Sequence, residues 1–340
     1  MLRVRLALPG ELHYRGAIKR RLAMSESSSH QRPIICVVIR PKTEDDRPSL
    51  QQALSELARQ DPTIRIETES PNGQATVAGM GESHLEVICD CIVREYKVQI
   101  EIGKPKVIYL ETIRKQSEAE GKYVRAVSGH CVYGHVKLRL EPLEPGGDYQ
   151  FVDESPEGTV PRKFLEAINS GIQQGMKGGV LAGCETVGVR AIFYDGSYHV
   201  EDSNEMAFKI AASMAFKEAA RKANPVILEP FMLIEVVTPE DFAAVILGDL
   251  SFRRGRIEGM EARTGSLVIS ALVPLAELIG YATHMRSSTQ GRASYSMTFA
   301  RYEEARHAGD SGAEEAGVVA NRPKGPTVGR GHAAAKPDSQ

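Results

Sequence analysis

The sequence predicts an α+β protein in which two modules with the element order βαββαβ flank a middle segment of a different pattern. Three observations support this class. Each outer module begins with the pattern of a buried strand, helical apolar spacing follows it, and a polar turn then joins two further strands. The order βαββαβ is typical of ferredoxin-like domains, in which two helices cover one face of a sheet.

The first module begins with PIICVVIR, a continuous apolar run that predicts a buried strand. A helix opens at Asp45 or Asp46 and places its apolar residues on one face. TIRIETE and QATVAGM then form a predicted hairpin around Asn72 and Gly73. A second helix and the strand VQIEIG complete the unit. The apolar residues at helical spacing in that helix are Leu85, Ile88, Ile92 and Tyr96.

The last module repeats this order. LEPFMLIEVV predicts a strand, and Thr238 and Pro239 start a helix. RIEGMEA and SLVISALVP are expected to pair across a turn at residues 263–265. A short helix near Leu275 and the strand ASYSMTFARY complete this module.

The middle segment has the strand candidates KVIYLETI, HVKLRLEPL and GCETVGVRAIFYDG. One predicted helix begins near Pro161, and another begins at Asp202, where Asp202 and Glu205 have the spacing of a capping box. The second helix is expected to be apolar on nearly all sides. Its predicted buried residues are Met206, Phe208, Ile210, Met214 and Phe216.

These patterns divide the chain into an irregular leader (1–32), a ferredoxin-like domain (33–104), a middle α+β domain (105–225), a second ferredoxin-like domain (226–305) and a tail (306–340). The leader has a weak transit-peptide composition, and an irregular segment is the favoured interpretation. The tail is rich in Gly, Ala and Pro, which predicts disorder.

The composition excludes several classes of protein. The 340 residues are 42% hydrophobic, as in soluble globular proteins, and a net charge of −2 leaves any nucleic-acid contact to a local patch. Five scattered cysteines favour a reducing compartment over a disulfide scaffold. No apolar run approaches the roughly 20 residues needed to cross a bilayer. We therefore expect a cytoplasmic monomer with no membrane partner.

The stretch SGHCVYGH, residues 128–135, resembles the start of a metal site. His130, Cys131 and His135 offer three ligands, whereas a structural zinc site closes at four, and a fourth ligand would have to come from a distant part of the chain. Neighbouring residues of a strand also point to opposite faces. The favoured interpretation is a glycine-containing turn between two strands with no metal, and a metal-binding module remains the alternative.

No nucleotide site is expected. GMGESH at 79–84 lacks the third glycine of a dinucleotide fingerprint, and the strand before it belongs to a hairpin rather than to a parallel unit. The phosphate-binding pattern G-x-x-x-x-G-K-[ST] and the guanine-nucleotide elements D-x-x-G and N-K-x-D do not occur. The chain by itself is therefore predicted to be no enzyme and to bind no cofactor.

Two loops of the last module carry arginines. GDLSFRRGRIEGM contributes Arg253, Arg254 and Arg256, and MRSSTQGR contributes Arg286 and Arg292. Guanidinium groups on loops suit bidentate contacts with phosphate, so these residues predict contact with RNA.

Seven stretches of the chain are together very similar to the C-terminal half of bacterial elongation factor G. They are AGMGESHLEVI, GKPKVIYLETI, YGHVKLRLEPL, GIQQGMKGGVLAGC, DGSYHVEDSNEMAFKIAASMAFKEAARKANPVILEP, GDLSFRRGRIEGMEAR and GYATHMRSSTQGRASYSMTF. The resemblance runs from Pro33 to Glu304. It implies a ferredoxin-like domain III, an elongated domain IV that resembles a small-subunit ribosomal protein fold, and a ferredoxin-like domain V.

The resemblance also implies partners and roles. The family promotes movement of tRNA and mRNA on the ribosome, with GTP and magnesium bound by its GTPase domain. A decoding-site tip would comprise Gly129, His130, Tyr133, Gly134, His135, Ser197, His199 and Asp202. Contacts with large-subunit RNA would involve Arg253, Arg254, Arg256, Arg286, Gln290 and Arg292. A relay between domains would involve Gly79, Gly81, Glu82 and His84.

The chain departs from the family pattern at the first tip loop. Residues 128–132 replace the usual Gly-Gly-Arg-Gly-Gln run, which removes a cation, and Val200 and Glu201 replace the usual Asp and Val. The GTPase half of the family has no counterpart in the sequence. Three interpretations stay open: an incomplete or decayed gene product, a fragment that works with a separate GTPase, and an autonomous ribosome binder.

Overall fold

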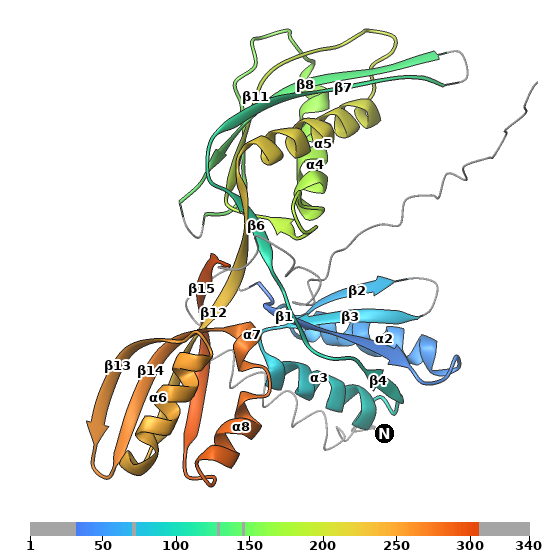
Figure 1. Cartoon of the computed structure of the whole chain (residues 1–340). Helices are drawn as coiled ribbons and strands as arrows, with labels where there is room; N and C mark the ends of the chain where they lie inside the picture. Colours follow the sequence, from blue (N-terminus) through green and yellow to red (C-terminus); the bar gives the residue numbers. More distant parts are fainter. Residues whose placement is uncertain (1–31, 70–72, 128–129, 145–146, 306–340) are drawn as a thin grey trace, which may run out of the picture.

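The computed structural model describes residues 32–69, 73–127, 130–144 and 147–305. The predictions for residues 1–31 of the leader, for the tail and for Asn72 and Gly129 lie outside the described residues. The described chain is an α+β protein with three sheets, as the sequence predicts. Figure 1 shows one sheet, with helices on one side, held away from the other two modules by the short strand β6 (Leu110–Ile113) and the long strand β12 (Pro225–Thr238).

The first module has the predicted order. It comprises β1 (Ile35–Pro41), α2 (Asp46–Gln60), β2 (Arg65–Glu69), β3 (Gln74–Gly79), α3 (Glu82–Arg94) and β4 (Ile100–Ile102). The strands are arranged β2-β3-β1-β4, with antiparallel pairs throughout. Apolar residues of both helices, among them Leu57 and Ile88, pack on one sheet face and are fully buried. The prediction that Tyr96 belongs to the second helix was wrong, because α3 ends at Arg94.

The last module has the same ferredoxin-like topology. It comprises β12 (Pro225–Thr238), α6 (Ala243–Phe252), β13 (Arg256–Arg263), β14 (Ser266–Pro274), α7 (Leu275–Leu278), α8 (Tyr281–Ser288) and β15 (Ser294–Glu304). Strand β12 lies between β14 and β15. Its first residues extend beyond the module and pair with β6 (Leu110–Ile113), which also pairs in parallel with β10 (Glu185–Thr186). One strand therefore connects the middle segment to the last module.

The middle segment forms a separate four-stranded sheet with the order β7-β8-β11-β9. Its elements are β7 (Ser117–Val127), β8 (His130–Pro142), β9 (Gln150–Asp153), the short 3-10 helix η1 (Arg162–Phe164), α4 (Leu165–Lys177), β11 (Val189–Ser197) and α5 (Glu205–Lys222). Helix α5 lies directly on β7 and β8. A Cβ at Gly121 would overlap the carbonyl oxygen of Ala211, so the close approach of helix and sheet requires glycine there.

Several sequence predictions for the middle segment were wrong. Strands β7 and β9 were not expected. Charged residues of β7 alternate with small or aromatic ones on a sheet with one exposed face, and neither strand has an apolar run. KVIYLETI forms two short strands, β5 (Lys106–Val107), which pairs with β1, and β6. The predicted turn SGHCVYGH is mostly strand, because β8 already begins at His130.

Helix α5 differs from its prediction in start and in buried face. Its cap is Asn204, whose side chain accepts a hydrogen bond from the Ala207 N–H at 2.9 Å, rather than Asp202. Met206 and Met214 are 65% and 47% exposed. The buried face is largely alanine, since only small side chains allow the helix to approach β7 and β8 so closely.

Candidate functional site

The end of the middle sheet that lies away from the other two modules is built by β8 and by the connection from β11 to α5 (Figure 1). The main chain of Tyr133 holds this connection. Its N–H donates to the Asp202 carbonyl oxygen at 2.9 Å, and its carbonyl oxygen accepts from the Ser203 hydroxyl at 2.9 Å. The connection closes on itself, because the His199 N–H donates to Ser203 Oγ and the Ser203 N–H donates to the His199 carbonyl.

Side chains join the same residues. The Tyr133 and His199 rings meet edge to face, with centroids 4.3 Å apart and planes at 86°. The Tyr133 hydroxyl lies 2.7 Å from Ser197 Oγ, which also lies 2.9 Å from His135 Nδ1. His135 Nε2 is 3.4 Å from the Glu120 carboxylate. The Ser197 hydroxyl thus bridges Tyr133 to His135. The His199 ring is exposed, whereas the Tyr133 and His135 rings are half-buried.

We call this end the tip; it comprises Tyr133, His135 and residues 197–203. Strand β7 adds two exposed cations beside it, Lys122 and Arg125, and the Lys122 ammonium lies 5.8 Å from the centre of the Tyr133 ring. Cations, an imidazole and hydroxyl groups can bind phosphate and base edges. The structure therefore brings six of the eight predicted tip residues into this region. Gly129 and the His130 side chain lie outside what is described.

The alternative prediction was a metal site at His130, Cys131 and His135, and the described residues of this group have other surroundings. Cys131 is exposed as a free thiol, and the two ring nitrogens of His135 face Ser197 and Glu120. Cys184 is buried, and burial raises the pKa of its thiol to about 12. Among the described residues, no three His, Cys, Asp or Glu side chains are placed to hold a metal ion.

The arginines of the α6–β13 turn are in ion pairs within the chain. Arg254 binds both oxygens of the buried Glu229, at 3.1 and 2.7 Å, and also binds Glu277 at 3.2 Å. Arg253 pairs with Asp249 at 3.1 Å and lies over the Tyr281 ring.

Other predicted RNA contacts have fewer partners. Arg256 binds Glu303 at 2.5 Å, whereas Arg286 and Gln290 are exposed near the end of α8. Arg292 is exposed and lies over the Phe242 ring. RNA contact by these residues stays a prediction, and the paired ones would have to exchange an internal carboxylate for phosphate.

Of the residues predicted to relay between domains, His84 is buried and pairs with the buried Asp61, Gly79 and Gly81 are also buried, and Glu82 is half-buried. His84 Nδ1 accepts from the Met80 N–H at 3.2 Å, so Nε2 carries the proton toward Asp61 Oδ2, 3.1 Å away. Burial would raise the pKa of Asp61, but hydrogen bonds from His84 and Thr63 outweigh it and lower the pKa to about 2. The sequence patterns gave no indication of the role of Asp61, which lies directly after α2.

The sequence also gave no indication of the role of Glu111. Its side chain lies on β6, is fully buried, and accepts four backbone N–H bonds. One oxygen accepts from Val180 and Leu181 at 2.6 and 3.1 Å, and the other from Ala182 and Cys184 at 2.8 and 3.1 Å. One carboxylate therefore fixes the loop after α4 to the strand that enters the middle domain.

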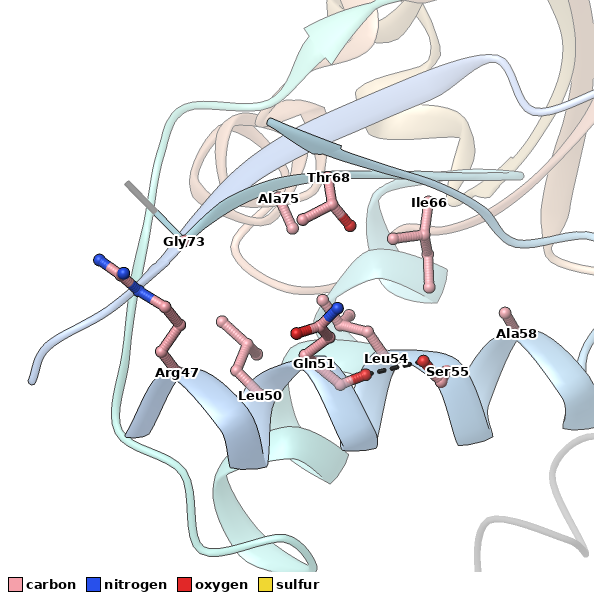
Figure 2. Close-up of a pocket in the computed structure, with 10 residues that line it drawn as sticks. All are labelled: Arg47, Leu50, Gln51, Leu54, Ser55, Ala58, Ile66, Thr68, Gly73 and Ala75. Carbon is pink, nitrogen blue, oxygen red and sulfur yellow. Dashed lines mark hydrogen bonds between the residues drawn. The ribbon is translucent and has the colours of Figure 1, made fainter. Parts of the chain in front are cut away.

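A hollow of about 340 Å³ lies in the first module, between α2 and the edge of the sheet at β2 and β3 (Figure 2). Leu50, Leu54 and Ile66 form its apolar wall, and Arg47 stands at one end. It lies on the helix-covered face of that sheet and so belongs to a different module from the tip.

Three family models match the chain. They are elongation factor G domain III over residues 31–104, elongation factor G domain IV over residues 105–224, and the elongation factor G C-terminus over residues 226–309. A crystal structure of a protein from Thermus thermophilus is 39% identical, with a TM-score of 0.65. The match covers 85% of this chain and 44% of that protein, so the chain spans less than half of its length.

Fold and matches together define the class as part of a translation elongation factor. The ferredoxin-like order of strands and helices in both outer domains agrees with this class. The chain belongs to the elongation factor G family and contains its domains III, IV and V, the last being the C-terminal domain. None of the described helices is long and apolar enough to span a bilayer.

Proposed function

We propose that this chain binds the ribosome and that its tip enters the decoding site, where it promotes movement of tRNA and mRNA. The observation that carries the proposal is the exposed imidazole of His199, held at the free end of domain IV beside Lys122 and Arg125. Exposed cations and rings on a braced loop suit contact with single-stranded or irregular RNA. The proposal implies a cytoplasmic, monomeric chain that contacts RNA of both subunits.

The role that we assign to this chain requires it to bind neither GTP nor magnesium. In the proposal, hydrolysis belongs to a separate GTPase domain, and the chain contributes ribosome contact. Binding without such a partner would make it an autonomous ribosome binder.

Cosedimentation of the purified chain with 70S ribosomes across a salt series tests the proposal. Cations that displace counterions from phosphate make log K fall as log salt rises. Full-length elongation factor G should compete, because both would occupy one site. A folded chain that does not bind at low salt would contradict the proposal and favour an inactive remnant.

Charge variants refine the test. Lys122→Gln should weaken binding and reduce the salt slope by about one contact. Lys222→Gln is the matched control, because Lys222 lies at the C-terminal end of α5, whereas the tip precedes its N-terminal end. Lys222 also pairs with Glu218 at 3.4 Å. Equal effects of the two variants would mean that the tip is not the contact surface.

A further inference from the structure

We propose that Tyr133 is the positioning residue of the tip, which fixes the orientation in which His199 meets RNA. The inference rests on the proposed function of the tip, and the role that it assigns to Tyr133 acts through His199. The Tyr133 side chain and main chain together contact both ends of the connection that carries His199.

The main-chain contacts set the position of the connection. Tyr133 pairs with Ser203 as a parallel bridge, and its N–H and carbonyl oxygen bind Asp202 and Ser203. The Ser203 hydroxyl accepts from the His199 N–H at 2.9 Å and donates to Tyr133. A single hydroxyl therefore couples the backbone of His199 to β8.

The side-chain contacts set the direction of the imidazole. The edge-to-face contact at 4.3 Å and 86° has the geometry that aromatic pairs prefer. The Tyr133 ring is itself held by its hydroxyl, 2.7 Å from Ser197, and Ser197 is held by His135. Because Tyr133 is fixed at both ends, His199 can be exposed and still adopt one orientation.

These contacts of Tyr133 explain how the exposed His199 ring avoids the entropic cost of becoming ordered when RNA binds. A side chain that is immobilised only in the complex loses rotamer freedom at that moment and weakens affinity. Contacts of this kind typically contribute a factor of about two to twelve in an equilibrium constant. Loss of the Tyr133 ring should weaken ribosome binding by that factor, and only through His199.

The first measurement is the NMR spectrum of the His199 ring in the full 340-residue chain. In the wild type, the Tyr133 ring current should shift the His199 ring protons. Tyr133→Leu should abolish the shift and Tyr133→Phe should keep it. Tyr198→Leu is the control, because it removes an exposed ring next to His199 that makes no ring contact with it in the described structure.

A double-mutant cycle supplies the functional readout, with the Kd for ribosomes carrying tRNA and mRNA. Tyr133→Leu should weaken binding about two- to twelve-fold in the wild type and should have no further effect in a His199→Ala background. Tyr133→Phe should restore most of the affinity. Equal effects of Tyr133→Leu in both backgrounds would overturn the proposal.

The outcomes separate this proposal from the function on which it rests. If His199→Ala leaves the affinity unchanged, the tip function fails, while the ring shifts still decide whether Tyr133 positions His199. Unchanged His199 shifts in Tyr133→Leu would refute positioning even where ribosome binding is intact. If Tyr133→Leu does not fold, Ser203→Ala takes its place, and an unperturbed His199 spectrum in that variant would also refute it.

Discussion

Replacing Glu111 by glutamine should loosen the loop after α4 and destabilise domain IV. The carboxylate is fully buried and accepts four backbone N–H bonds. An amide keeps one oxygen acceptor and turns an NH2 group toward the other two donors. Two hydrogen bonds to a charged group would be lost, which amounts to about 3–6 kcal/mol. A buried amide costs less than a buried carboxylate, so we expect about 3 kcal/mol.

Hydrogen exchange measures this loss locally. The amides of Val180, Leu181, Ala182 and Cys184 should exchange about two orders of magnitude faster in Glu111→Gln, because about 3 kcal/mol corresponds to that ratio. The denaturant midpoint followed by far-UV circular dichroism should fall as well.

The matched control is Glu185→Gln, the same substitution one residue beyond the loop. Glu185 is half-buried and forms an ion pair with Arg65 at 3.4 Å across the domain III–IV boundary. We expect it to change stability by less than about 0.5 kcal/mol. Wild-type exchange of the four amides in Glu111→Gln would refute the claim that the carboxylate holds the loop.

Two further outcomes follow from buried charges. The pKa of Asp61 is lowered from 3.8 to about 2, so the ionised carboxylate adds about 2 kcal/mol to the free energy of unfolding. This contribution is fully present above pH 3.8 and is lost as the pH falls toward 2. The difference in free energy of unfolding between wild type and Asp61→Asn should therefore shrink as the pH falls from 3.8 toward 2. A difference that stays constant with pH would contradict the lowered pKa of Asp61. Arg254→Met leaves Glu229 buried without its bidentate partner and should cost about 3–5 kcal/mol in urea unfolding. The double variant with Glu229→Met should recover most of this loss, and a double variant as unstable as the single one would argue against the pair.

Much of the fold could be predicted because local patterns agree with it. Both ferredoxin-like orders were predicted from apolar periodicity and turn residues, and the structure confirms the strand order of each. The same local signals failed in domain IV. Strand β7 alternates charged with small or aromatic residues over one exposed face, and the Met residues of α5 lie on its outer side. Periodicity marks which residues are apolar but not which face another element will cover.

The candidate site was predicted only by resemblance. Nothing in the spacing of Tyr133 and His199 indicates that their rings touch, because the two residues are 66 positions apart and lie on different elements. The loop position of the arginines in the α6–β13 turn predicts contact with RNA, which stays a prediction. It gives no sign that Glu229 and Glu277 reach Arg254 from β12 and α7.

The sequence by itself determined the α+β class, the helix and strand periods of the outer domains, and the family to which the chain belongs. Those properties are encoded within segments of about ten to twenty residues, where side-chain period selects the element. The tertiary structure alone decided which carboxylate holds which loop and which ring faces His199. Such contacts depend on side chains brought together from distant segments, as Glu111 and Val180 are across 69 positions. Burial makes them strong, because buried donors and acceptors away from water must find each other.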